Sequence, residues 1–150
     1  MELKKASLCD AEKLLQMQKD AFAEIFEKYR DYDTNPACET TDRMKQKLSD
    51  GSDFYFITNG SEILGAIRII TSGTRKRISP LFILKQHRGK GFAQAAIRLA
   101  ENIYGEHGWE LSTIMQEKGN CRLYEKLGYR RTGEMQRINE RMDIVFYEKD

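Results

Sequence analysis

The stretch of residues 81–93 combines residue types that could bind a phosphate group. Its letters, LFILKQHRGKGFA, run from an apolar segment through a glycine turn into a segment of helical periodicity. The first N–H groups of such a helix lack internal partners, and the positive end of its dipole lies at the turn. Gly89 and Gly91 let the backbone approach an anion closely, while Arg88 and Lys90 add positive charge. These residues predict a phosphate or pyrophosphate site, although an ordinary tight turn with solvated basic residues has the same composition.

Two common phosphate loops do not match this segment. The Walker pattern needs GxxxxGK followed by serine or threonine, and the chain has no such run. The dinucleotide pattern GxGxxG needs a third glycine where the chain has Gln94, and it also needs an early strand-helix-strand unit. Neither kind of nucleotide site is therefore indicated.

A third pattern does match. Residues 88–93, RGKGFA, resemble the R/Q-x-x-G-x-G/A signature of the GNAT superfamily of N-acetyltransferases. Ile83 and His87 fall where the strand consensus of that family has a branched aliphatic residue and a ring. Residues 123–129, LYEKLGY, look like the second family signature, a helix ending in LYEKxGF/Y. The expected order of elements is also similar to the core topology of the family, so the resemblance spans most of the chain.

The resemblance implies acetyl-CoA as the acetyl donor and cosubstrate. In the family, the strand before the loop separates from its parallel neighbour, and the pantetheine arm pairs with the exposed backbone there. On this chain, the backbone of Leu81, Phe82 and Ile83 would bind pantetheine. The residues that would wrap the pyrophosphate, chiefly through backbone N–H groups, are Arg88, Gly89, Lys90, Gly91, Phe92 and Ala93.

Tyr124 stands where the family has its usual general acid. Attack of an amine on a thioester expels a thiolate whose conjugate acid has a pKa of about 8.5, if it behaves like a cysteine thiol. A phenol with a pKa of about 10 stays protonated at neutral pH and can donate as negative charge develops on sulfur. Without the flanking motif, Tyr124 would be interpreted as a partly buried aromatic residue on an amphipathic helix. With it, we expect Tyr124 to be the acid.

One position departs from the family pattern. Members often carry an asparagine seven residues before the tyrosine, in contact with the pantetheine arm, and here that position is Glu117. Asn120 either makes this contact from a neighbouring turn or caps a helix after Gly119. Cys121 lies one helical turn from Tyr124 but has no histidine near it in sequence, which argues against an acetyl-cysteine intermediate.

The general base is left open by the sequence. An alkylamine with a pKa of about 10.4 must lose a proton before it attacks. The family often uses a strand carboxylate for this step, but residues 78–84 contain no acid. The candidates are Glu24, Glu27, Glu39 and Glu117, and a water chain to bulk solvent could serve instead.

The region that selects the acceptor in the family corresponds to residues 23–42, AEIFEKYRDYDTNPACETTD. Its acids and tyrosines suit a cationic amine through charge and cation–π contact, although a solvated helix end and loop would have a similar composition. The predicted substrate-binding residues are Glu24, Tyr29, Glu39 and Glu117. We expect the acceptor to be a primary amine of a small molecule or a peptide.

Two other functions compete with this hypothesis. One is a non-catalytic acyl-CoA-binding sensor or interaction module, which the missing strand acid favours and Tyr124 disfavours. The other is nucleic-acid binding through the basic residues Arg75, Lys76, Arg77, Lys85, Arg88 and Lys90. A net charge of +2, from 25 Lys and Arg against 23 Asp and Glu, argues against a nucleic-acid partner.

Hydrophobic periodicity predicts the elements that must position these residues. Strands are expected at 2–6, 54–57, 63–70, 78–84, 111–115, 129–134 and 142–147, and the fourth of them is apolar enough to be buried on both faces. Helices are expected from Ser7 to Tyr29, from Thr40 to Leu48, from Phe92 to about His107, with Ala96 and Ile103 on the apolar face, and from Cys121 to Leu127. The residues 78–84, expected to be buried on both sides, lead through a right-handed crossover into a parallel pair.

The fold class is therefore mixed α/β (α+β). The resemblance implies a GNAT-like central mixed sheet of about seven strands, mostly antiparallel with one central splayed parallel pair, flanked by about four helices. With 150 residues and 40% hydrophobic residues, we expect a single domain over residues 1–150.

Three widely spaced cysteines and two histidines predict neither a disulfide framework nor a metal site. No apolar run is long enough for a membrane span, and the N-terminus lacks an apolar signal core, so we expect a cytoplasmic protein without a membrane partner. Either a monomer or a homodimer is compatible with the terminal strands.

Overall fold

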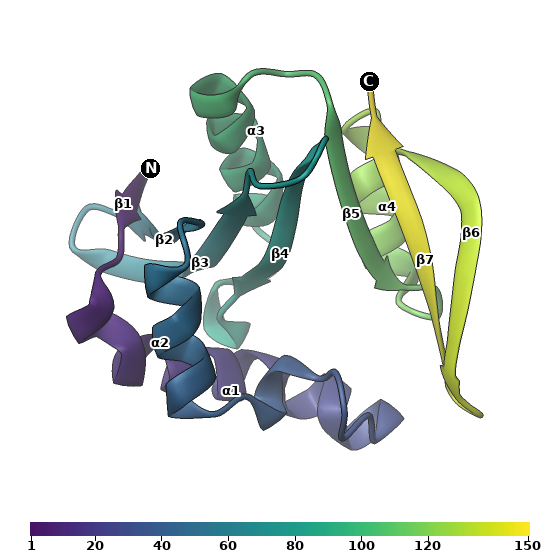
Figure 1. Ribbon diagram of the computed structural model, residues 1–150, viewed down its shortest axis with the longest axis horizontal. Helices are drawn as coiled ribbons and strands as arrows, with labels where there is room; N and C mark the ends of the chain where they lie inside the picture. Colours follow the sequence, from purple (N-terminus) through teal and green to yellow (C-terminus); the bar gives the residue numbers. More distant parts are fainter.

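The structure is a computed structural model that describes residues 1–150, with one seven-stranded sheet and four α-helices (Figure 1). The strands are β1 Glu2–Lys5, β2 Asp53–Asn59, β3 Glu62–Ile70, β4 Lys76–Ile83, β5 Trp109–Ile114, β6 Arg130–Asn139 and β7 Met142–Lys149. The helices are α1 Ala11–Tyr29, α2 Thr41–Ser49, α3 Phe92–Tyr104 and α4 Lys118–Lys126, with the short 3-10 turns η1 Leu8–Asp10, η2 Pro36–Cys38 and η3 Lys85–His87.

The sheet is mixed, as the sequence predicts. Its strand order is β1-β2-β3-β4-β5-β7-β6, and each neighbouring pair is antiparallel except β4 and β5. These two parallel strands pair only through Lys76 with Trp109 and through Arg77 with Glu110. Beyond Arg77 they diverge, and Figure 1 shows β4 and β5 separating from a common end. The predicted splayed parallel pair is confirmed.

Two apolar clusters cover the two faces of the sheet. On the face covered by α3 and α4, one cluster contains Ile97 together with Ile67 and Trp109. On the face covered by α1 and α2, the other contains Leu14 and Met44. No helix of the chain combines the length and the apolar character that a membrane span requires.

The apolar face of α3 differs from the predicted one. Ala96, Ile97 and Ala100 are fully buried, whereas Ile103 is 55% exposed. Ile103 was expected on the apolar face because its spacing fits a longer helix, but α3 ends at Tyr104, where Gly105 adopts a φ of +99°. The helix therefore stops before the predicted end near residue 107.

Strand β4 is not buried on both faces along its length, which corrects the interpretation of its apolar letters. Ile78 is buried, but Ser79, Pro80 and Leu81 are half-buried. The reason is the divergence from β5, which removes the neighbour that would cover this part of the strand. The exposure of Leu81 marks the start of an opening in the sheet.

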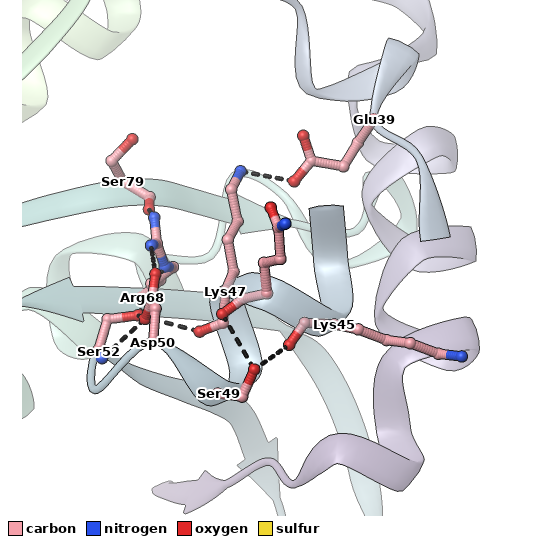
Figure 2. A network of polar contacts seen from close by, with 9 residues as sticks. Glu39, Lys45, Lys47, Ser49, Asp50, Ser52, Arg68 and Ser79 are labelled. Atoms are coloured by element: carbon pink, nitrogen blue, oxygen red, sulfur yellow. Dashed lines mark hydrogen bonds and ion pairs between the residues drawn. The ribbon is translucent and has the colours of Figure 1, made fainter. Parts of the chain in front are cut away.

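Arg68 holds β4 at the point of divergence. One residue of β3, Arg68, faces two residues of β4, Ser79 and Pro80, at an irregularity in the ladder. Its guanidinium donates to the Ser79 carbonyl at 3.1 Å, to Ser52 Oγ at 2.9 Å and to Asp50 Oδ2 at 3.0 Å. Figure 2 shows these residues around Arg68. Pro80 has no N–H to donate, and sheets accommodate proline at such irregularities. The Ser79 carbonyl is thus bound from the β3 side.

Helix α4 begins three residues earlier than the sequence pattern predicts. It starts at Lys118, preceded by Glu117 as its N-terminal cap residue. Asn120 therefore lies inside the first turn, and the interpretation of Asn120 as a helix cap is wrong. A glycine followed by an asparagine is typical of a loop that ends at a helix cap, but here Gly119 already lies within the helix.

The C-terminal end of α1 is tied to the other half of the chain. Glu117 accepts hydrogen bonds from Lys28 Nζ at 2.8 Å and from the Tyr29 hydroxyl at 2.5 Å. Asn139 Nδ2, at the turn between β6 and β7, donates to the Tyr29 carbonyl at 2.8 Å. Burial opposes ionisation of Glu117, but the hydrogen bonds from Lys28 and Tyr29 outweigh it and hold the pKa of this carboxyl below 4.5.

Replacement of Gly65 by alanine should destabilise the fold. A Cβ at this position would lie 2.0 Å from the carbonyl oxygen of Phe82, so β3 and β4 would have to move apart. We expect Gly65→Ala to lower the free energy of unfolding by about 1–3 kcal/mol. Urea titration followed by circular dichroism measures this change. Gly73→Ala is the matched control, because the nearest atom to its Cβ is 3.6 Å away. Equal urea midpoints for the two variants would contradict close packing at Gly65.

The tie at Glu117 should make stability depend on pH. Because its folded pKa is lowered, its contribution is complete above 4.5, the usual pKa, and is lost as pH falls through the folded value. The difference in unfolding free energy between the wild type and Glu117→Gln should therefore shrink between about pH 7 and about pH 3. Lys28→Met should reduce this pH dependence as well. A difference in unfolding free energy that stays constant over this range would show that an ionised Glu117 does not stabilise the fold.

Candidate active site

A cavity of about 620 Å³ opens where β4 leaves β5. Its walls come from α1, the end of β4, the turn before α3 and the first turns of α3 and α4. We call it the loop cavity. Among its lining residues are Leu81, Phe82 and Ile83 of β4 and Tyr124 of α4, so the structure brings these predicted site residues together.

The turn between β4 and α3 presents unpaired backbone donors to the loop cavity. Gly89 and Gly91 adopt φ values of +77° and +81°, and no atom lies within 4 Å of a Cβ built on either. No backbone N–H from Gly89 to Gln94 has an acceptor within the protein; the first helical bond runs from Ala95 N–H to the Gly91 carbonyl. This row of donors at a helix N-terminus is suited to an anion such as a pyrophosphate.

The basic side chains of this turn, unlike its backbone N–H groups, are not unpaired donors lining the cavity. Arg88 Nε donates to the Ile83 carbonyl at 2.9 Å and Arg88 Nη2 to the Ala21 carbonyl at 2.6 Å. The guanidinium therefore joins the end of β4 to α1, and Arg88 also lines the loop cavity. Lys90 is exposed and does not line the cavity, whereas Gly91 and the following Phe92 and Ala93 do.

The free edge of β4 offers a second set of backbone groups. The N–H of Leu84 bonds to β3. Because backbone groups of successive residues alternate in direction, those of Phe82 also face β3, while those of Leu81 and Ile83 face the opening left by β5. Of the three residues predicted to bind pantetheine through their backbone, Leu81 and Ile83 are therefore placed to do so, and Phe82 is not.

A second cavity of about 360 Å³ lies on the open face of β5, β7 and β6. We call it the sheet cavity. It is bounded by the loop after α1 and by the first part of β4. Phe22, Ile25, Leu81, Asn120 and Tyr124 line both cavities. The two cavities therefore meet at Tyr124.

The environment of Tyr124 keeps its hydroxyl protonated and available. The side chain is 9% exposed and packs edge-on against Tyr129 and at a tilt against Tyr147. Burial, with a smaller contribution from Cys121, raises the pKa of Tyr124 to about 12. Its hydroxyl forms no hydrogen bond with any group of the protein, although the hydroxyls of Tyr129 and Tyr147 each have a carboxylate partner.

The predicted substrate-binding residues fall in different places. Glu117 lines the loop cavity, and Tyr29 lies behind it with its hydroxyl on the carboxylate. Glu24 also lines the loop cavity, where its exposed carboxylate pairs with a lysine of η3. Glu39 lies outside both cavities and pairs with Lys47 Nζ at 2.6 Å, as Figure 2 shows. Of the candidate bases, Glu27 also lies outside the two cavities.

The basic residues considered for nucleic-acid binding do not form a common patch of free cations. Arg75 pairs with Asp150 at 2.5 Å, and Lys76 donates to the Tyr104 carbonyl at 2.9 Å. Lys85 pairs with a glutamate of α1, and Arg88 binds two carbonyls. Arg77 lines the sheet cavity.

Sequence reasoning missed the floor of the sheet cavity. It is made by Ser112 and Ile114 of β5 with Ile144 and Phe146 of β7. Their register places Ser112 beside Phe146 and Ile114 beside Ile144. Strand alternation could have placed the two residues of each strand on one face, but it could not have shown that no helix covers this part of the sheet.

A family model described as "Acetyltransferase (GNAT) domain" matches residues 17–150. Among curated proteins, N-acetyltransferase 8 of Rattus norvegicus is 30% identical over 106 residues, which cover 64% of this chain and 48% of that protein. N-acetyltransferase 8B of the same organism is 28% identical over 106 residues, with the same coverage. The chain thus spans about half the length of the curated relatives it matches.

Solved structures share the fold. A spermidine N-acetyltransferase from Vibrio cholerae, in complex with CoA and spermine, superimposes with a TM-score of 0.75 at 18% identity, covering 97% of this chain and 92% of that one. An N-acetyltransferase from Thermoplasma acidophilum, in complex with coenzyme A, gives a TM-score of 0.71 at 15% identity, covering 99% and 98%. Together with the family model, which matches most of the residues, these findings establish that the chain belongs to the GNAT acetyltransferase family.

Proposed function

We propose that this protein is an acetyl-CoA-dependent N-acetyltransferase that transfers the acetyl group to a primary amine by direct attack. The observation that carries the proposal is the unpaired hydroxyl of Tyr124 at the meeting point of two cavities, one of them lined by unpaired backbone N–H groups. Family membership supports the same activity.

The residues of the loop cavity fit acetyl-CoA, which supplies a thioester carbonyl for attack. We assign the N–H groups of residues 89–94 to the pyrophosphate, because they are unpaired and share a helix N-terminus. The backbone groups of Leu81 and the N–H of Ile83 would pair with the amides of the pantetheine arm, while the Ile83 carbonyl already accepts from Arg88. Asn120, which lines both cavities, could add a side-chain contact near the reacting end.

We assign Tyr124 as the group that donates to the departing sulfur. Its pKa of about 12 keeps the phenol protonated at neutral pH. That pKa is higher than the value of about 8.5 for a thiol, so complete proton transfer to the thiolate would be uphill. The hydroxyl therefore acts mainly by hydrogen bonding to the negative charge as it develops.

Deprotonation of the acceptor amine is assigned to solvent. Glu117 is the inner carboxylate of the loop cavity, but its lowered pKa makes it a poor proton acceptor, and two of its hydrogen bonds hold α1 in place. Glu24 is exposed and ion-paired. Neither is suited to take a proton from an amine with a pKa of about 10.4, so water within the cavities fits this role better.

The competing hypothesis is a module that binds acyl-CoA without catalysis. The two functions differ at the acceptor side, because a sensor needs no second cavity beside the thioester. The sheet cavity at Tyr124 therefore favours the enzyme. Tight acetyl-CoA binding with no thiol release for any member of a broad amine panel would support the module instead.

The turn at Gly91 should be essential for acetyl-CoA binding. Gly91→Glu places a side chain at a φ of +81° and a negative charge beside the phosphate donors, so we expect affinity to fall at least about tenfold. Lys90→Ala should change it much less, because Lys90 does not line the cavity. Isothermal titration calorimetry with acetyl-CoA measures both, and Gly91→Ala separates backbone strain from charge. Equal affinities for wild type and Gly91→Glu would remove this turn from the site.

Loss of the Tyr124 hydroxyl should affect rate but not stability. Phenylalanine keeps the ring packing, and the hydroxyl has no partner in the protein, so the unfolding free energy should change by less than about 0.5 kcal/mol. We expect kcat for thiol release to fall about a hundredfold in Tyr124→Phe. Tyr32→Phe, an exposed tyrosine outside both cavities, is the control. An unchanged kcat in Tyr124→Phe would exclude its role as the donor.

A further inference from the structure

The charges of the sheet cavity bear on the acceptor. Asp31 and Arg77 are the charged residues that line it. Asp31 is 3% exposed, and its carboxylate is occupied: Oδ1 accepts the N–H groups of Asp33 at 3.2 Å and Thr34 at 3.1 Å, and Oδ2 accepts the Thr34 hydroxyl. The carboxylate thus shapes the loop after α1 and has little capacity left for a ligand.

Arg77 is in the opposite situation. It is half-buried, and it forms no ion pair with any carboxylate of the chain, including its register neighbour Glu110 on β5. Its one polar contact is a 3.5 Å approach of Nη2 to Ser112 Oγ. A guanidinium has five N–H donors, so most of its capacity is free. A partly desolvated cation without a counter-ion is costly, and an anion bound in the cavity would offset this cost.

The floor of the sheet cavity includes apolar side chains. Ile114, Ile144 and Phe146 form the floor, and all three are partly exposed because no helix covers them. Arg77 lies four residues before Leu81, the β4 residue that lines both cavities, which is about 13 Å along a strand. Arg77 and Tyr124 therefore line the same cavity, with the guanidinium reaching toward Ser112 on its floor.

We propose that the acceptor is a primary amine that carries an anionic group, such as a carboxylate, at the far end of an apolar body, and that Arg77 binds this group. The proposal rests on the proposed acetyltransferase function and names its substrate class. It differs from the expectation of a cationic acceptor drawn from the acidic residues 23–42, because Glu39 lies outside the cavities and Asp31 is internally bonded. A polyamine would place a second ammonium group beside Arg77.

Three linear amines of nearly equal length test the proposal: 8-aminooctanoate, 8-aminooctanamide and 1,8-diaminooctane. They share the reacting amine and the apolar chain, and they differ only in a terminal carboxylate, neutral amide or ammonium. We measure kcat/KM for thiol release with each, and calorimetric affinity for each in the presence of saturating CoA. Wild-type protein should favour the carboxylate over the amide by about tenfold to a hundredfold, with the ammonium weakest.

Variants at Arg77 identify the group responsible. Arg77→Gln should lower kcat/KM and affinity for aminooctanoate by about tenfold to a hundredfold while leaving aminooctanamide nearly unchanged. Arg77→Lys, which keeps the charge, should retain a preference for the carboxylate. Arg43→Gln, on the exposed side of α2 and outside both cavities, should behave like wild type. Circular dichroism and acetyl-CoA affinity confirm that each variant is folded.

The outcomes separate this inference from the function on which it rests. Turnover of all three amines with no preference for the carboxylate, or a preference that survives in Arg77→Gln, overturns the role of Arg77 and leaves the acetyltransferase intact. Acetyl-CoA binding without thiol release from any amine overturns the enzyme; the calorimetric series then still decides whether Arg77 binds an anion. Equal affinities for all three compounds by calorimetry overturn the anion site.

Discussion

The short parallel pairing of β4 with β5 is the constraint on which the site depends. The two strands pair at Lys76 and Arg77 and then diverge, so one sheet contains an opening with a free backbone edge on one side. A continuous ladder would have consumed the backbone groups of Leu81 and Ile83 and left no space for the loop cavity. On the β3 side, Gly65 permits a close approach to Phe82, and Arg68 binds the Ser79 carbonyl, so β4 is held firmly by one neighbour while it leaves the other.

Such an opening would weaken the contact between the two halves of the sheet if nothing else joined them. Helix α1 supplies the missing links from below the opening (Figure 1). Arg88 binds a carbonyl of α1 and a carbonyl of β4, Glu117 accepts from Lys28 and Tyr29, and Asn139 donates to the backbone of α1. These are polar, partly exposed contacts, each worth about 0.5–1.5 kcal/mol, and they hold the walls of both cavities without filling them.

The loop cavity and the sheet cavity present different polar groups along their length. The turn before α3 contributes unpaired N–H donors, the middle contributes a buried phenol with a raised pKa, and the far end contributes an unpaired guanidinium. The polar groups around them are mutually satisfied: the hydroxyls of Tyr129 and Tyr147 have carboxylate partners, and Asp31 is bonded within its own loop. Free donors among neighbours whose polar groups are satisfied indicate where ligands bind, because an unmet buried donor carries a cost.

Patterns of a few residues in the sequence were sufficient to predict the start of α2 and two turns, because these depend on neighbouring residues alone. The helix predicted to begin at Thr40 is α2, which Thr40 caps. The turn at residues 59–60 joins two strands, and the glycine turn before α3 has the left-handed geometry that only glycine adopts easily. The family signature located Tyr124 and the turn, and both line the loop cavity. Element ends were less accurate: α3 stops at Tyr104 and α4 begins at Lys118, because a single glycine can end one helix and lie inside another.

Only the tertiary structure decided what each charged side chain does. The sequence predicts that Arg88 contributes to a phosphate site, whereas its guanidinium binds backbone carbonyls. It also predicts that Glu39 binds substrate, whereas Glu39 pairs with Lys47 outside both cavities. Arg77, one of several basic residues in the sequence, lines the sheet cavity without a carboxylate partner. The backbone follows preferences that act over a few residues, whereas the role of a long charged side chain depends on which distant groups the fold brings within about 3 Å of it.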